Sequence, residues 1–237
     1  MYREFEEYAS NFNLQEPGIN RKFYHSQRVA LLAARIAENL GWSLPEVLLA
    51  KQIGLLHDIG RLKEWSEKKT FNTNIDHGEY GVEVLEKDNY MQKFNITKDD
   101  FLTVCAAVYY HDKYAVPDDL KDNKQVLLVR DADKIDILNI LSDGDGLEEP
   151  LTNHQISEIV KTTFNEEKSI LTTDIKTYGD RVLRNLALIY DINYDYSLKI
   201  IKEQGYLDKY YETLNNKELY QGYFNKINNY IEKKLLN

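Results

Sequence analysis

Apolar residues recur with helical spacing along most of the chain, and no segment alternates between apolar and polar residues as a strand does. Residues 22 to 40 carry an apolar stripe with the period of an α-helix, which Gly41 stops. The stripe consists of Val29, Leu32, Ala33, Ile36, Ala37 and Leu40. Ser43 and Glu46 have the spacing of a capping box, and they predict a helix that continues to about Asp58. Gly60 then allows the chain to turn away.

Polar and aperiodic residues fill positions 61 to 76 and predict a loop. Asp76 with Glu79, and Thr97 with Asp100, have the spacing of helix N-termini. The helices predicted in this part of the chain cover residues 76–87, 101–111 and 122–141.

A turn-rich stretch at residues 142–150 is a candidate boundary. Three or four helices are predicted beyond it, around 154–167, 175–190, 196–213 and 217–236. The fold class is therefore expected to be all-α. We expect a helical core over residues 1–145 and a C-terminal extension over 146–237 that packs on it, together forming one structural domain.

Composition narrows the function classes. The formal net charge of −9 argues against a broad surface for duplex nucleic acid, which requires a basic footprint. No apolar stretch is long enough for a membrane span, and the acidic start of the chain does not read as a signal peptide. The single cysteine, Cys105, excludes an internal disulfide and fits a reducing compartment. We therefore expect a cytoplasmic protein without a membrane partner.

His57 and Asp58 follow the apolar run from Val47 to Leu56, which predicts a buried helix. Burying an ionised carboxylate is unfavourable unless it is paired or bound to a metal. The pair therefore suggests a metal site, and three more histidines fall near predicted helix ends, where side chains of separate helices can converge. These histidines are His25, His77 and His111.

Asp131 adds a carboxylate in the interior of an otherwise apolar helix. Each of these residues also has a simpler interpretation when taken alone. A single histidine is commonly a hydrogen-bonded core or surface residue, and Asp131 or Asp133 could belong to a solvated face beside Arg130 and Lys134.

The ordered pattern of His25, His57-Asp58 and Asp131, with the literal sequence His-Asp-Ile-Gly, resembles the HD superfamily of metal-dependent phosphohydrolases. The resemblance covers residues 20 to 145, and His77 and His111 match its two-metal members. It implies an all-α HD core with additional C-terminal helices. It also implies that His25, His57, Asp58 and Asp131 hold one ion, and that Asp58 bridges to a second ion bound by His77 and His111.

The implied cofactor is one or two divalent ions, because imidazole and carboxylate ligands without sulfur suit Mn, Fe, Co, Ni or Mg. Such ions attract phosphate and lower the pKa of a bound water towards ~7, which makes hydroxide available for attack on phosphorus. Arg61 and Lys134 are candidates for catalytic contacts with a phosphate, and Arg28 is a further candidate for substrate binding.

The expected function is therefore hydrolysis of a phosphomonoester or phosphodiester, of a nucleotide or a similar small metabolite. Two alternatives stay open. The four histidines and two aspartates also resemble the di-iron oxygenases of the superfamily, such as inositol oxygenase, and a non-catalytic signalling module is a third reading. The sequence names neither the substrate nor the oligomeric state.

Overall fold

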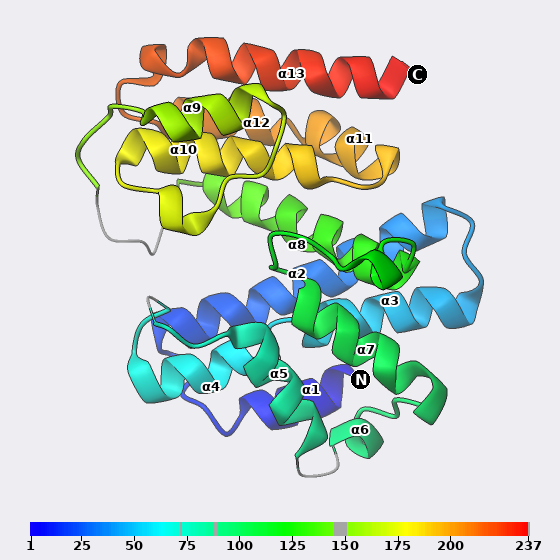
Figure 1. The fold of residues 1–237 in the computed structure, drawn as a ribbon. Coiled ribbons are helices and arrows are strands. Elements are labelled where there is room, and N and C mark those ends of the chain that lie inside the picture. Colours follow the sequence, from blue (N-terminus) through cyan, green and yellow to red (C-terminus); the bar gives the residue numbers. More distant parts are fainter. Residues whose placement is uncertain (72, 88–89, 145–150, 237) are drawn as a thin grey trace. The chain divides into compact units, whose positions relative to one another are not determined.

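The computed structural model describes residues 1–71, 73–87, 90–144 and 151–236. Regular structure in these ranges is helical, with no strand among them, which confirms the predicted all-α class (Figure 1). The chain divides into two compact units, Met1–Asp133 and Lys134–Asn237. Most of the boundary predicted at 142–150 lies outside the described residues. No helix in the described ranges has the length and apolar run that crossing a membrane requires.

The first unit contains seven α-helices, one 3₁₀ helix and the start of another α-helix among its described residues. They are α1 (Tyr2–Ala9), α2 (Pro17–Asn39), α3 (Leu44–Leu56), α4 (Ile59–Lys68), α5 (His77–Glu86), α6 (Tyr90–Lys93), α7 (Lys98–Tyr110), η1 (Asp118–Leu120) and α8 (Lys124–Ser142). Helix α8 begins in the first unit and continues into the second. A core of buried apolar side chains, including Phe5, Ile53 and Leu56, holds the first unit together.

The predicted helix starts are confirmed. Ser43 caps α3, and its backbone N–H donates to Glu46 Oε2 over 2.8 Å, which closes the capping box. The carboxylate of Asp76 accepts from the first backbone N–H groups of α5, and Thr97 does the same for α7. These caps fix where each helix begins, and therefore how many residues separate its start from the histidine that it carries.

Two glycines let neighbouring helices approach closely. A Cβ added to Gly54 of α3 would lie 2.9 Å from the Cα of Ala30 in α2. A Cβ on Gly78 of α5 would lie 2.6 Å from the carbonyl oxygen of Tyr109 in α7. Backbone atoms cannot move aside as a flexible side chain can, so both contacts require a residue without a side chain. The helices α2 and α3, and α5 and α7, therefore pack backbone against backbone.

The loop predicted over residues 61 to 76 is wrong for its first half, because α4 covers Ile59–Lys68. Its polar residues do not all face water. Glu64 is fully buried, and it accepts hydrogen bonds from Arg61, over 2.6 Å, and from the hydroxyl of Thr73. The sequence does not distinguish a buried, hydrogen-bonded glutamate from a solvated one. The buried side of this helix was therefore not recognised.

The sequence had suggested that the chain turns at Gly60. Gly60 instead lies inside α4. Its lack of a side chain serves packing, because a Cβ there would lie 2.7 Å from the backbone nitrogen of Gly81 and 2.8 Å from the carbonyl oxygen of His77. Helix α4 therefore contacts α5 directly beside His77.

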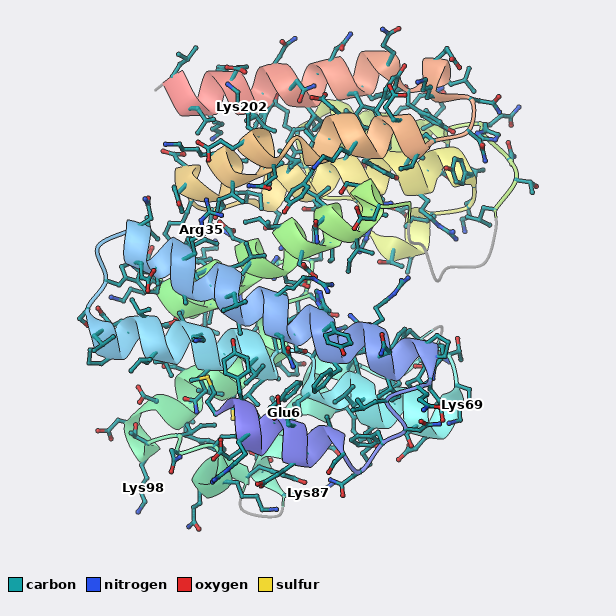
Figure 2. The ribbon with its side chains drawn as sticks, turned by 180° about the vertical axis from the view of Figure 1, so that it is seen from behind. Glu6, Arg35, Lys69, Lys87, Lys98 and Lys202 are labelled. Atoms are coloured by element: carbon teal, nitrogen blue, oxygen red, sulfur yellow. The ribbon has the colours of Figure 1, made fainter. Side chains whose placement is uncertain are left out.

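The second unit is also helical. Its elements are α9 (Glu158–Asn165), η2 (Thr172–Asp174), α10 (Tyr178–Leu186), η3 (Ala187–Asp191), α11 (Asp195–Gln204), α12 (Tyr206–Thr213), η4 (Lys217–Leu219) and α13 (Gln221–Leu236). The single helix predicted over 196–213 is divided at Gly205, whose φ of +64° ends α11. Lys202 of α11, labelled in Figure 2, pairs with Glu232 of α13 at 2.6 Å between Nζ and Oε1.

Candidate metal centre

His57 and Asp58 lie at the junction of α3 and α4, and both side chains are buried. Nδ1 of His57 lies 2.7 Å from the carbonyl oxygen of Gly54. A carbonyl can only accept, so Nδ1 carries the hydrogen and Nε2 of the neutral ring has a lone pair. The turn at the end of α3 thus orients one imidazole nitrogen and one carboxylate towards the same point.

The first half-site, as we name it, joins His25, His57, Asp58 and Asp133. Nε2 of His25 in α2 lies 3.1 Å from Nε2 of His57. Each of these nitrogens lies 3.4 Å from Oδ2 of Asp58. Oδ1 of Asp133 in α8 lies 3.1 Å from Nε2 of His25 and 3.6 Å from Nε2 of His57. Two imidazoles and two carboxylates therefore meet around one small volume.

The second half-site uses the other oxygen of Asp58, together with His77 and His111. Nε2 of His77, at the start of α5, lies 3.0 Å from Nε2 of His111, at the end of α7. Oδ1 of Asp58 lies 3.7 Å from the first nitrogen and 3.5 Å from the second. Nδ1 of His111 donates to the carbonyl of Val108 over 2.7 Å, so its Nε2 also presents a lone pair.

Arg130 of α8 holds the end of α7 from which His111 projects. Its guanidinium donates to the carbonyl oxygens of Tyr110 and of His111, the latter over 3.4 Å. These carbonyls have no partner within their own helix, so a buried arginine satisfies them. The contact fixes the position of the His111 backbone.

The residues fit divalent metal ions. Ligands that share an octahedral ion at about 2.1 Å are roughly 3.0 Å from their neighbours, close to the separations found in both half-sites. Oδ1 of Asp58 is buried and accepts no hydrogen bond from any residue that the structure describes. His25, His57 and Asp58, and likewise Asp58, His77 and His111, form groups able to hold an ion. An orphaned buried oxygen that faces imidazole nitrogens is what a bridging carboxylate requires.

Electrostatics keep two of the ligand groups, Asp58 and His77, in the forms that bind metal. Burial opposes the charge of Asp58, but the Lys22 ammonium and His57 hold the pKa of this carboxyl well below its usual range. Burial, followed by the charge of Arg61, lowers the pKa of His77 well below its usual range. An ionised carboxylate and a neutral imidazole are the forms that coordinate a cation.

The structure places Asp133 against His25 and His57, whereas the sequence prediction named Asp131 of the same helix. Each residue of an α-helix is rotated by about 100° from the one before, so residues two apart point to opposite sides of α8. Asp131 is fully buried and has its own polar or ionic partner. Asp133 is therefore the carboxylate of α8 that lies beside the two imidazoles, and a ligand role for Asp131 stays a prediction.

Two cations flank Asp58. Nε of Arg61 lies 3.9 Å from Oδ1 of Asp58, and its role as a substrate contact stays a prediction. Lys22, which the sequence reasoning missed, lies closer, with Nζ 2.5 Å from Oδ2 of Asp58. Both cations contact the ring of Phe71, at 5.2 Å from the Arg61 guanidinium and 5.7 Å from the Lys22 ammonium. Lys22 precedes His25 by three residues on one helix, and this spacing was the available signal.

The other two predicted basic residues are placed differently. Arg28 follows His25 by three residues in α2 and is partly buried. Lys134 follows Asp133 directly, lies in the second unit, and pairs with Asp191 at 2.8 Å between Nζ and Oδ2. Their roles towards a substrate stay predictions.

A comparison with protein families agrees with this geometry. Residues 23–138 match the family model described as HD domain. The match spans α2 to α8 and includes His25, His57-Asp58, His77, His111 and Asp133. No curated protein and no solved structure matches the chain. Residues 23–138 are therefore an HD domain, the domain that characterises a superfamily of metal-dependent hydrolases.

Proposed function

We propose that the chain is a metal-dependent phosphohydrolase that cleaves a phosphomonoester or phosphodiester of a nucleotide or similar small metabolite. One observation carries the proposal. Asp58 lies between two pairs of histidines and is flanked by two cations, Lys22 and Arg61. The histidines that could bind divalent ions and the cations that could attract a phosphate therefore all lie beside the same carboxylate.

In this proposal the first half-site holds one ion, with Asp133 taking the place that the sequence reasoning gave to Asp131. The second half-site would hold the other ion, and Asp58 would serve both, because one of its oxygens faces each half-site. Mn, Fe, Co, Ni or Mg suits these nitrogen and oxygen donors. Divalent ions there supply a water with a pKa lowered towards about 7 and offset negative charge on a phosphoryl group.

The chain's own cations orient the substrate. Arg61 is held by its hydrogen bond to buried Glu64, so its guanidinium is fixed without help from a ligand. Nε of Arg61 is buried and has no hydrogen-bond partner among the described residues, which leaves a donor for a phosphate oxygen. Lys22 adds an ammonium on the Oδ2 side of Asp58. A dianionic phosphoryl group therefore meets positive charge from two directions.

The same four histidines and two aspartates would also suit a di-iron oxygenase. The ligands alone do not separate the two activities, because both need imidazole and carboxylate donors. Lys22 and Arg61 favour the hydrolase, since paired cations beside the centre recognise an anionic group.

The test is turnover by the full chain after loading with Mn²⁺, Co²⁺, Ni²⁺, Mg²⁺ or Fe²⁺. Substrates are p-nitrophenyl phosphate, bis-p-nitrophenyl phosphate and a panel of nucleotides. We expect phosphate-ester cleavage that Asp58→Ala abolishes. Asp118→Ala removes a carboxylate whose side chain is 92% exposed and should keep the activity. Dioxygen consumption with Fe²⁺ and no hydrolysis by any metal form would replace the hydrolase with the oxygenase. Tight metal binding without either activity would indicate a non-catalytic module.

A further inference from the structure

The pair His111-Asp112 repeats the local geometry of His57-Asp58. His57 ends α3 with φ −54° and ψ −37°, and His111 ends α7 with φ −59° and ψ −36°. Each imidazole donates from Nδ1 to the carbonyl three residues earlier, over 2.7 Å in both cases. An aspartate follows each histidine. The chain therefore presents the same imidazole–carboxylate unit twice, at the ends of two different helices.

The carboxylate of Asp112 faces the second half-site. Its Oδ2 lies 3.3 Å from Nε2 of His77, the same nitrogen that lies 3.0 Å from Nε2 of His111. In the first half-site, Oδ1 of Asp133 lies 3.1 Å from Nε2 of His25 in the same way. Each half-site thus has two imidazoles, one oxygen of Asp58 and one further carboxylate.

Neighbouring charges hold the Asp112 carboxylate in this orientation. Its Oδ1 pairs with Nζ of Lys113 at 3.2 Å, and the same ammonium pairs with Asp76 at 2.5 Å. Asp76 is the N-cap of α5 and directly precedes His77. The lysine therefore ties Asp112 to the start of the helix that carries His77, and leaves Oδ2 directed at the imidazole.

We propose that Asp112 is a protein ligand of the ion in the second half-site, an inference that rests on the proposed function and extends its ligand set. A further carboxylate oxygen makes this half-site favour hard divalent ions such as Mn²⁺ and Mg²⁺. The Asp112 side chain is 31% exposed, whereas the side chain of Asp133 is only 10% exposed. The second ion therefore lies on the side of the centre that is more accessible to solvent.

The test titrates metal-free full-length protein with Mn²⁺ alone, by calorimetry and by electron paramagnetic resonance of the bound ion. The wild type should bind two equivalents and give the signal of a coupled pair. Asp112→Asn should weaken the second equivalent by about 10- to 100-fold, the usual effect of altering a metal's immediate surroundings, and leave the first unchanged. Circular dichroism checks that this partly exposed substitution preserves the fold.

Asp118→Asn is the matched control, because it makes the same change at a carboxylate whose side chain is 92% exposed and lies outside both half-sites. It should retain two equivalents. Unchanged binding of the second ion by Asp112→Asn would overturn the inference, as would equal weakening by Asp118→Asn, or a wild type that saturates at one ion. Two bound ions without phosphate-ester cleavage would instead remove the proposed function and leave the assignment of Asp112 standing.

Discussion

The imidazole of His25 in α2 lies 3.1 Å from the carboxylate of Asp133 in α8, so two helices far apart in the sequence meet at the first half-site. Burial raises the pKa of Asp133, but the neighbouring imidazoles of His25 and His57 hold that pKa well below its usual range. The carboxylate is therefore ionised next to two imidazoles, which is the arrangement of a metal ligand.

Asp133→Asn should weaken binding of the first Mn²⁺ equivalent by at least about 10-fold, because it removes a charged ligand. Asp131→Asn should leave metal affinity unchanged and lower the melting temperature, since it alters a buried carboxylate with its own partner. Calorimetric titration and thermal unfolding measure the two effects. The reverse result, with metal lost in Asp131→Asn alone, would restore the ligand set predicted from the sequence.

Lys22→Met should raise the KM for a phosphate ester by about 10- to 100-fold, the loss expected for one charge-assisted hydrogen bond. Metal binding should persist, because the ammonium is not a ligand. Steady-state kinetics and inhibition by inorganic phosphate measure the change. Lys87→Met is the control, since its side chain is 62% exposed and pairs with Glu83 on the surface of the first unit (Figure 2). An unaltered KM in Lys22→Met would remove this lysine from the substrate site.

Gly60→Ala should destabilise the first unit by about 1–3 kcal/mol, because the added methyl group meets the backbone of α5. The substitution should also weaken the second Mn²⁺ equivalent, since α5 carries His77. Urea unfolding and metal titration measure these effects. Gly222→Ala provides the contrast, because its Cβ would meet nothing within 4 Å, and it should be neutral or stabilising by up to about 1 kcal/mol. Similar stability of both variants would contradict the close contact.

Glu46 links the N-terminal ends of α3 and α8 through its contacts with Ser43 and Lys124. A side-chain hydrogen bond from Lys124, followed by the Ser43 side chain and backbone, lowers the pKa of Glu46 to about 2. A carboxyl with a depressed folded-state pKa stabilises the fold above its ordinary pKa of 4.5 and loses this effect as the pH falls towards 2. Glu46→Gln should therefore lower the free energy of unfolding at pH 6. It should also reduce the loss of that free energy as the pH falls from 4.5 to 2. Urea unfolding at pH 6 and pH 3 measures the difference, and parallel curves for the two proteins would contradict it.

The helix starts could be predicted because their chemistry is local. Ser43, Asp76 and Thr97 satisfy backbone N–H groups two or three residues away, so the sequence contains the whole interaction. The histidines of both half-sites could be proposed for a similar reason, because each stands near the end of a recognisable helix.

The register of α8 could not be predicted from its pattern. Consecutive residues from Arg130 to Asp136 are all buried, so no exposed face marks the orientation of the helix. Asp131 and Asp133 were equally compatible with that pattern. Helix α4 was missed because Glu64, a residue typical of surfaces, is buried against Arg61 and Thr73. The partners of Asp133, His25 and His57, lie in distant parts of the sequence, whereas those of Glu64 are near in sequence but give no apolar signal.

Three contacts in the first unit, at Gly54, Gly60 and Gly78, depend on a missing side chain. The distance between two helices that meet through side chains can be increased or decreased one methyl group at a time. Where they meet through glycine backbones, no substitution can bring them closer. The spacing of the two histidine pairs is therefore close to a minimum that substitution can only widen. Adapting this centre to a smaller ion would have to proceed by exchanging ligands, because the helices cannot approach more closely.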